Sequence, residues 1–213
     1  MPRPQCSKCM RPASLCLCAY IPHLHSATRV LVLQHPSEQR HALNTARLAA
    51  LGLANAELLV GEVFSDLQAH LVASGRRALL LFPGDHSVAL SNVEPAGEAG
   101  DLLVVPDGTW RKARKLLYMN PCLLELPRVT LPIGGRSRYR LRKAPSEDAL
   151  STLEAVVGAL NVLEQPQRFD ALLEPFERLI DGQISAMGHD VYLRNHASSI
   201  AYQERSMRSD NES

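Results

Sequence analysis

Long apolar stretches are missing from this sequence of 213 residues. Its strongest apolar runs are as short as residues 78–82, whereas a membrane-spanning helix needs about 20 consecutive apolar residues. The first residues also lack the apolar core of a secretory signal, so we expect a soluble protein of the reducing cytoplasm. A hydrophobic content of 46% and a charged content of 21% are ordinary for a globular chain, which excludes a disordered or fibrous protein.

Several motifs that identify common enzyme classes are also absent. The sequence contains neither the Gly-x-Gly-x-x-Gly pattern of dinucleotide-binding folds nor the Gly-x-x-x-x-Gly-Lys pattern of phosphate-binding loops. It has no Gly-x-Ser-x-Gly nucleophile turn and no His-Glu-x-x-His pair. A Rossmann-type dinucleotide site or a P-loop NTPase therefore has no motif to support it.

Net charge is small, at +1, but it is distributed unevenly. The segment 111–143 contains ten lysine or arginine residues and a single acid, Glu125, which gives it a charge of +9. The rest of the chain then carries a charge of −8. One strongly basic segment on an acidic body favours a polyanionic partner that meets one face, and nucleic acid is the commonest such partner.

Four of the five cysteines fall within thirteen residues near the amino terminus. In a reducing compartment, such a cluster favours a structural, tetrahedral Zn²⁺ site over disulfides. The second pair has a Cys-x-Cys spacing, tighter than usual, and either His23 or His25 could replace one cysteine. A redox role and unligated thiols are the alternatives, and Cys122 alone is expected to be an inert buried residue. The candidate zinc ligands are Cys6, Cys9, Cys16 and Cys18.

Short apolar runs alternate with helical patterns after the cysteine cluster, which is typical of an α/β domain with a mostly parallel sheet and flanking helices. We expect strands at 29–34, 55–60, 78–82, 102–105 and 128–131. Expected helices cover 38–51, 65–73, 109–119, 151–163 and 169–187, and the fourth starts with a capping box. Along the first helix, Arg40, Asn44 and Arg47 should share one face. We divide the chain into a zinc segment (1–27), a catalytic domain (28–194) and a polar tail (195–213).

The strongest candidate for chemistry is the junction between the fourth strand and the third helix. Asp107 follows this strand, and ligands of α/β sheets bind at the carboxyl ends of the strands. The structural alternative is that Asp107 or Thr109 caps the helix and that Trp110 belongs to the core. Cations in the first helical turns are disfavoured by the helix dipole, so their presence favours bound phosphates. These cations are Arg111, Lys112, Arg114 and Lys115.

A second basic pattern places an arginine at every second residue of an extended segment, which brings four guanidinium groups to one face. Four like charges in a row repel one another, and binding to a phosphate backbone would relieve that repulsion. The alternative is a charged edge strand that protects the sheet from aggregation. The four residues are Arg136, Arg138, Arg140 and Arg142.

Several short motifs follow one another along nearly the whole chain, and the central one is Asp107-Gly108-Thr109-Trp110. The others are the four-cysteine cluster, Leu33-Gln34-His35-Pro36 with Glu38, Asn44-Thr45-x-Arg47-Leu48, Leu81-Phe82-Pro83, Tyr139-x-Leu141-Arg142 and Leu150-Ser151-Thr152-Leu153-Glu154-Ala155. Taken in this order, the motifs resemble the DTW-domain family of tRNA-uridine aminocarboxypropyltransferases.

The resemblance implies a SPOUT-like α/β fold whose C-terminal knot forms the S-adenosylmethionine pocket. It also implies transfer of the 3-amino-3-carboxypropyl group from this co-substrate to N3 of a tRNA uridine, with release of 5′-methylthioadenosine. In bacterial members the target is uridine 47 of the variable loop.

Roles for individual residues follow from the resemblance. Asp107, Thr109 and Trp110 are the catalytic candidates: Asp107 is a base for N3–H or only orients it, and Trp110 stacks on a base or lies in the core. Candidate cofactor-binding residues are Leu131, Tyr139, Leu141, Ser151 and Thr152. Candidate RNA-binding residues are Arg40, Arg47, Arg111, Lys112, Lys115, Arg136, Arg138 and Arg140. Arg40, Asn44 and Arg47 would meet a phosphate or the methionyl carboxylate.

Two other classes of function remain open at this point. A SPOUT-type RNA methyltransferase would use the same donor and leave S-adenosylhomocysteine as its product. A non-catalytic RNA-binding module with zinc would explain the charges and cysteines but would consume no donor. Within the enzyme class, ribosomal RNA is an alternative target. The sequence implies no protein partner.

Overall fold

The computed structural model describes residues 4–132, 150–188, 190–192 and 194. The strands are β1 (Arg29–Gln34), β2 (Ala56–Val60), β3 (Ala78–Leu81), β4 (Val88–Ala89), β5 (Leu102–Asp107) and β6 (Arg128–Thr130). The α-helices are α1 (Ala46–Gly52), α2 (Leu67–Ala73), α3 (Trp110–Met119), α4 (Thr152–Leu163) and α5 (Glu174–Met187). Short 3-10 turns are η1 (Ala13–Leu15), η2 (Cys18–Tyr20), η3 (Pro36–Glu38), η4 (Leu90–Asn92), η5 (Gly97–Ala99), η6 (Pro121–Leu123) and η7 (Asp170–Leu173).

Within the described residues, the strands form one sheet in the order β2-β1-β5-β3-β6-β4, and every pairing in it is parallel. This confirms the expected α/β class with a parallel sheet. β5 lies between β1 and β3, so it occupies the middle of the sheet although it comes late in the chain. The sheet order therefore reverses at β5, and the carboxyl ends of β1, β5 and β3 meet where α/β folds place their ligands.

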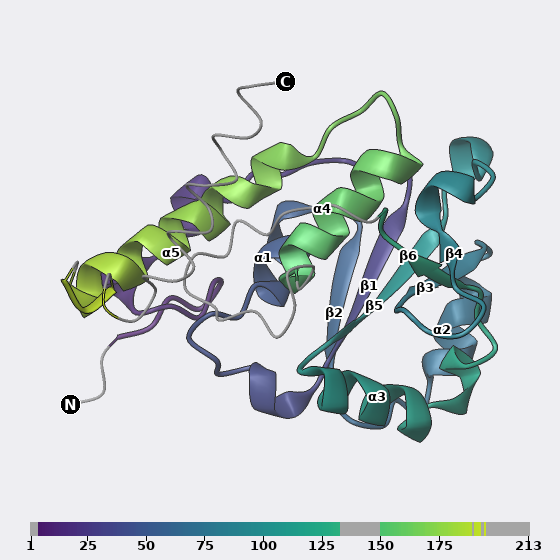
Figure 1. Cartoon of the computed structure of the whole chain (residues 1–213), viewed down its shortest axis with the longest axis horizontal. Coiled ribbons are helices and arrows are strands. Elements are labelled where there is room, and N and C mark those ends of the chain that lie inside the picture. Colours follow the sequence, from purple (N-terminus) through teal and green to yellow (C-terminus); the bar gives the residue numbers. More distant parts are fainter. Residues whose placement is uncertain (1–3, 133–149, 189, 193, 195–213) are drawn as a thin grey trace.

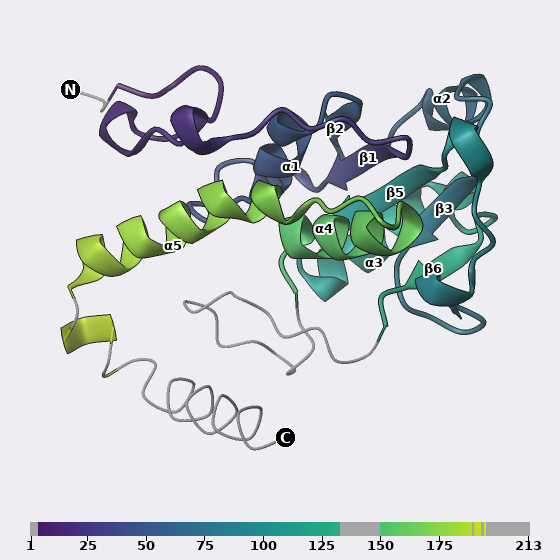
Figure 2. The same ribbon diagram turned by 90° about the horizontal axis from the view of Figure 1, so that it is seen from above.

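Helices cover both faces of the sheet (Figure 1). Val30 and Val32 of β1 pack in one core with α1, α4 and α5, whereas Leu31 and Leu33 pack in a second core with α2 and α3. Burial on both faces explains why the central strands are continuous apolar runs rather than alternating patterns. In the second view, the amino-terminal segment runs alongside α5, far from β3 and β6 (Figure 2).

The helix predicted over 38–51 is wrong in its first half, because the α-helix begins only at Ala46. Asn44 explains the delay. Its side-chain nitrogen donates to the carbonyls of Glu38 (3.1 Å) and Gln39 (3.4 Å), and its side-chain oxygen accepts from the backbone N–H of Arg47 (3.3 Å). Such local contacts to the backbone compete with helix formation. Arg40 therefore does not share a helical face with Arg47.

The remaining boundaries differ less. The helix expected over 169–187 begins as the 3-10 turn η7, and α5 starts where Pro175 fits a first helical turn. Strand β4 was not predicted, since two residues carry no periodic signal. The knot and the SPOUT assignment depend on the path of residues 133–149, which lie outside the described residues, as does the polar tail 195–213.

Candidate active site

Asp107 is the last residue of β5, at the carboxyl edge of the sheet. Its register partner on the neighbouring strand β1 is Gln34, which also ends its strand. The backbone carbonyl of Asp107 accepts from the N–H of His35 at 3.0 Å, so the two strands remain paired up to this point. Asp107 is 9% exposed and Gln34 is fully buried, and the carboxyl group therefore sits in a protected niche rather than on the surface.

Two side chains donate hydrogen bonds to the carboxyl group of Asp107, one to each of its oxygens. The Nε2 group of Gln34 donates to Oδ2 at 2.8 Å, and the hydroxyl of Thr152 donates to Oδ1. Thr152 is the first residue of α4, so the carboxyl group also lies at the positive end of a helix dipole. A carboxylate that accepts a hydrogen bond at each oxygen has a fixed orientation, and a group that accepts or orients a proton requires this.

A second layer of contacts orients Gln34. Its Nε2 group also donates to Oδ1 of Asn44 at 3.2 Å, and Nδ2 of Asn44 lies 3.4 Å from Oε1 of Gln34. The two amides therefore face each other, and Asn44 is in turn fixed by the backbone before α1. Neither Gln34 nor Asn44 is predicted from the sequence to contact Asp107. The available signal was the single glutamine that ends the apolar run of β1, beside a strand that ends in an acid.

Burial raises the pKa of Asp107 above the usual range for a carboxyl group. The hydrogen bonds from Thr152 and Gln34 work against this rise, the negative charge of Glu38 adds to it, and His41 opposes it. Burial dominates because a charged group loses its hydration in a protected niche. The nearby cations of α3 therefore do not lower the pKa of Asp107 below its usual range.

The residues after Asp107 form the start of α3. Thr109 is the N-cap, and its hydroxyl accepts from the backbone N–H of Lys112 at 3.4 Å. Trp110 is 46% exposed and meets the ring of Phe82 edge-on, with ring centroids 5.4 Å apart. Trp110 is thus a half-exposed ring at the rim of the site rather than a core residue, and the capping role belongs to Thr109, not to Asp107.

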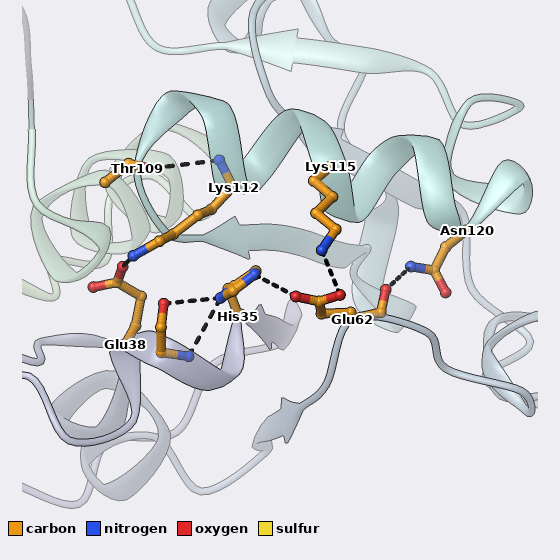
Figure 3. Close-up of polar contacts among 8 residues, drawn as sticks. His35, Glu38, Glu62, Thr109, Lys112, Lys115 and Asn120 are labelled. Carbon is orange, nitrogen blue, oxygen red and sulfur yellow. Dashed lines mark hydrogen bonds and ion pairs between the residues drawn. The ribbon is translucent and has the colours of Figure 1, made fainter.

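Two of the predicted RNA-binding lysines form ion pairs with acids of neighbouring loops (Figure 3). Lys112 binds Glu38 at 2.6 Å, and Lys115 binds Glu62 at 2.6 Å. Glu62 also contacts His35 at 2.8 Å, and its pKa is lowered chiefly by the hydrogen bond from Lys115. These acids neutralise part of the positive charge on α3, so Lys112 and Lys115 have partners even without a bound phosphate. Arg111 and Arg114 are exposed.

The predicted cofactor residues are only partly described. Leu131 follows β6 and packs against Gly158 of α4, where an added Cβ would approach its Cδ2 to 3.2 Å. Ser151 caps α4 in the expected capping box with Glu154, so its hydroxyl is already committed. Thr152 contacts Asp107. Tyr139 and Leu141, like the predicted RNA-binding residues Arg136, Arg138 and Arg140, lie outside the described residues.

The four clustered cysteines converge as expected, and their sulfur atoms all lie within 4.8 Å of one another. Sγ of Cys6 is 3.6 Å from Sγ of Cys18, and Sγ of Cys9 is 3.8 Å from Sγ of Cys16. A tetrahedral zinc ion with bonds of about 2.3 Å separates its sulfurs by about 3.8 Å, whereas a disulfide requires about 2.05 Å. The geometry therefore fits a four-thiolate metal site and not a pair of disulfides.

The electrostatics of the cluster also call for a cation. Backbone N–H groups of Cys9 and Lys8 lower the pKa of Cys6, whereas burial and the neighbouring thiols raise the pKa of Cys18. Several thiolates this close repel one another unless a metal ion compensates them. Among the described residues, His23 and His25 are not part of the cluster; their rings meet edge-on, with centroids 5.5 Å apart.

No helix in the described part of the chain is long and apolar enough to cross a membrane. No solved structure matches the chain significantly. Proteins named tRNA-uridine aminocarboxypropyltransferase 2 from Drosophila melanogaster and Macaca fascicularis are 34% and 31% identical to it, each over 85% of this chain. The Arabidopsis thaliana protein named tRNA-uridine aminocarboxypropyltransferase A is 28% identical over 75% of it.

The matches cover 76% of the fly protein, 64% of the macaque protein and 72% of the Arabidopsis protein. The chain thus spans less than two thirds of the macaque relative. The family model described as the DTW domain matches residues 3–184, which include the cysteine cluster, the sheet and the Asp107 niche. This protein belongs to the DTW-domain family.

Proposed function

We propose that this protein transfers the 3-amino-3-carboxypropyl group of S-adenosylmethionine to N3 of a uridine in tRNA and releases 5′-methylthioadenosine. Relatives named for this activity match the chain over most of its length. The observation that carries the proposal is the buried carboxyl group of Asp107, oriented by Gln34 and Thr152 at the carboxyl edge of the sheet.

The residues of the niche suit the proton transfer in this reaction. N3 of uridine carries a proton, so a new N3–carbon bond forms only as the N3–H bond breaks and the carbon–sulfur bond of the donor breaks. In our proposal Asp107 accepts the N3 proton, and methylthioadenosine leaves with the electron pair of the carbon–sulfur bond. A raised pKa makes a carboxylate a stronger base, and its fixed orientation contributes to alignment of the nucleophile.

The donor substrate, in this proposal, binds beside the amino terminus of α4, where Leu131 and Thr152 lie. Tyr139 and Leu141 would complete the pocket, and a SPOUT-like knot would form its floor. The hydroxyl of Thr152 already meets Asp107, so the donor and the proton acceptor would share one side chain. Ser151 would contribute through its cap, which fixes the start of α4, rather than through a direct contact.

Helix α3 offers a surface for the RNA next to the niche. Trp110, Arg114 and Tyr118 follow one another at intervals of four residues, and Trp110 and Tyr118 are 46% and 79% exposed. Residues at this spacing share one face of a helix, and Arg111 extends it. Exposed aromatic rings interleaved with arginines are suited to stacking on bases and neutralising phosphates. Trp110 is the ring nearest Asp107 in sequence, so we propose that it stacks on the target uridine or a neighbour.

The remaining assignments complete the proposal. Lys112 and Lys115 would exchange their partners Glu38 and Glu62 for phosphates, and Arg136, Arg138 and Arg140 would extend the contact. Uridine 47 of the variable loop is the proposed target. Residues 28–194 would form the catalytic domain and residues 1–27 a zinc segment held by the four thiolates.

Incubation of the full chain with unmodified tRNA and S-adenosylmethionine labelled on the carboxyl carbon tests this function. The proposal predicts label on the tRNA together with methylthioadenosine in solution. S-adenosylhomocysteine without label on the tRNA would instead indicate a methyltransferase, and an unconsumed donor would indicate an RNA-binding module. Either result would overturn the proposed reaction.

A further inference from the structure

A cavity of about 760 Å³ lies between the amino-terminal cysteine segment, the loop before α1 and helix α5. We call it the arginine cavity. Its lining includes four arginines and a histidine, and no aspartate or glutamate is among the described residues that line it. Two of these walls, the cysteine segment and α5, come from distant parts of the sequence and run side by side in Figure 2. The basic lining residues are Arg11, Arg40, His41, Arg47 and Arg178.

Arg47 shows that this site is prepared for an acceptor. Its Nε atom is buried and has no hydrogen-bond partner among the described residues. A buried donor without a partner costs stability, and native proteins nearly always satisfy such groups. Arg47 stands in the first turn of α1, where the helix dipole disfavours a cation. Arg47 lines the cavity, so an anion bound there would offset the unfavourable position of this cation at the start of α1.

Two other arginines are fixed by neutral groups. Arg11 is 8% exposed and donates to the backbone carbonyls of Ala42 and Asn44, which fastens the loop before α1 to the cysteine segment. The guanidinium of Arg178 lies over the ring of Tyr20, 4.8 Å from its centroid. A cation–π contact holds a guanidinium in place while leaving its N–H groups able to donate. Two of the four guanidinium groups that line the cavity are thus held in place.

The number of cations indicates the class of ligand. One arginine is enough for a single carboxylate, and a donor with a sulfonium charge would be repelled by four. A nucleic-acid backbone presents several phosphates in succession, and arginine binds them with paired N–H groups. Asn44 lines the cavity and also pairs with Gln34, which holds Asp107. A strand that leaves the cavity past Asn44 would therefore approach the Asp107 niche.

We propose that the arginine cavity binds backbone phosphates of the RNA substrate, at a contact separate from the α3 surface. This inference rests on the proposed function for the identity of the RNA. The proposal also gives the cysteine segment a role in RNA binding, because Cys9 and Cys16 line the cavity. The four-cysteine cluster then holds one wall of an RNA-binding cavity in shape.

Equilibrium binding of unmodified tRNA, measured at several salt concentrations without any donor, tests the proposal. Arg47→Gln and Arg178→Gln should each weaken binding by roughly tenfold, and each should reduce the slope of log affinity against log salt by about 0.7–0.9. The matched control is Arg168→Gln, which removes an exposed arginine paired with Asp170 at 2.9 Å. Arg47→Gln should unfold at a temperature no lower than the wild type, since its buried Nε has no hydrogen bond to lose.

Three outcomes would overturn the proposal. RNA affinity and salt slope of the cavity variants could equal those of the control. In a separate titration without RNA, the affinity of the cavity variants for S-adenosylmethionine could fall while their RNA affinity is unchanged, which would make the cavity a carboxylate site. Inorganic phosphate alone could stabilise the wild type while the substitutions leave RNA affinity unchanged, which would make the cavity a site for free anions. Because no donor is present, loss of binding in the variants would support the cavity even if the proposed transfer reaction failed.

Discussion

Gln34 and Asp107 end adjacent parallel strands at paired positions, and Nε2 of Gln34 donates to Oδ2 of Asp107 at 2.8 Å. The fully buried amide of Gln34 therefore fixes the carboxyl group that we propose as the proton acceptor. Replacement by leucine of similar size, Gln34→Leu, removes this donor and the contact to Asn44. A buried acceptor left without its donor costs about 1–3 kcal/mol, so we expect urea unfolding to show a loss of that size.

The same change should shift the acid limb of the pH–rate profile. Gln34 lowers the pKa of Asp107, so its removal raises that pKa further, and a base with a higher pKa becomes active only at higher pH. A merely structural role for Gln34 would reduce the amount of folded enzyme at every pH and leave the limb in place. That result would remove Gln34 from the positioning role.

Thr152 provides a matched pair of variants at the other oxygen of Asp107. Thr152→Val keeps the shape but removes the hydroxyl, and we expect the acid limb to move to higher pH, as for Gln34→Leu. Thr152→Ser keeps the hydroxyl and should restore the wild-type limb. Measurement of the rate under saturating substrates from weakly acidic to neutral pH distinguishes the two. Identical limbs in valine and serine variants would show that the hydroxyl does not act on Asp107.

Ionisation of the Asp107 carboxyl group should lower the free energy of unfolding. Its pKa is raised in the folded state, so folded protein binds more protons than unfolded protein between the usual carboxyl pKa and the raised one. Wild-type stability therefore falls as pH rises through that window, and Asp107→Asn lacks this loss. The difference in unfolding free energy between the variant and wild type should grow in favour of Asp107→Asn as pH rises, then level off. A difference independent of pH would mean that burial does not shift Asp107.

The cysteine cluster predicts one bound zinc ion per chain. Chelation, or the substitution Cys9→Ser, should lower the thermal midpoint of unfolding and should release the zinc into solution. Cys122→Ser is the control, because this half-buried cysteine lies in η6, away from the cluster. Purified protein that holds substoichiometric zinc, with all thiols titrating freely, would contradict a metal site.

The exposed face of α3 predicts a stacking contribution to RNA binding. Tyr118→Ala removes a ring that is 79% exposed, so stability should change by less than about 0.5 kcal/mol. Loss of one stacked base should weaken RNA binding by about 1–3 kcal/mol. Val72→Ala on α2, at 70% exposure, is the control for the loss of an exposed apolar side chain. Equal affinity of both variants would remove Tyr118 from the RNA contact.

Much of the sheet could be predicted because its strands are buried on both faces. Runs such as 30–33 and 102–105 must be apolar throughout when helices cover both sides, and turn residues mark their ends. The start of α4 was equally clear, because the capping box of Ser151 and Glu154 is a local signal. Such features depend on neighbours in the sequence and need no knowledge of the fold.

Contacts between distant residues could not be predicted in the same way. Asn44 delays the start of the expected helix by binding the backbone, and its second partner is Gln34 on a strand ten residues away. The ion pair of Lys112 with Glu38 depends on which loop faces α3, which the strand order decides. The arginine cavity joins residues 11, 47 and 178, which no local pattern connects.

Transfer of the labelled aminocarboxypropyl group by Asp107→Asn, compared with wild type and Arg168→Gln in a single turnover, tests the central claim most directly. We expect Asp107→Asn to bind tRNA within a few-fold of wild type and to transfer label at least about 100-fold more slowly, since general base catalysis contributes on the order of 10²–10⁴. Arg168→Gln should match wild type in both measurements. Label transfer by Asp107→Asn at the wild-type rate, with equal tRNA binding, would contradict the assignment of Asp107.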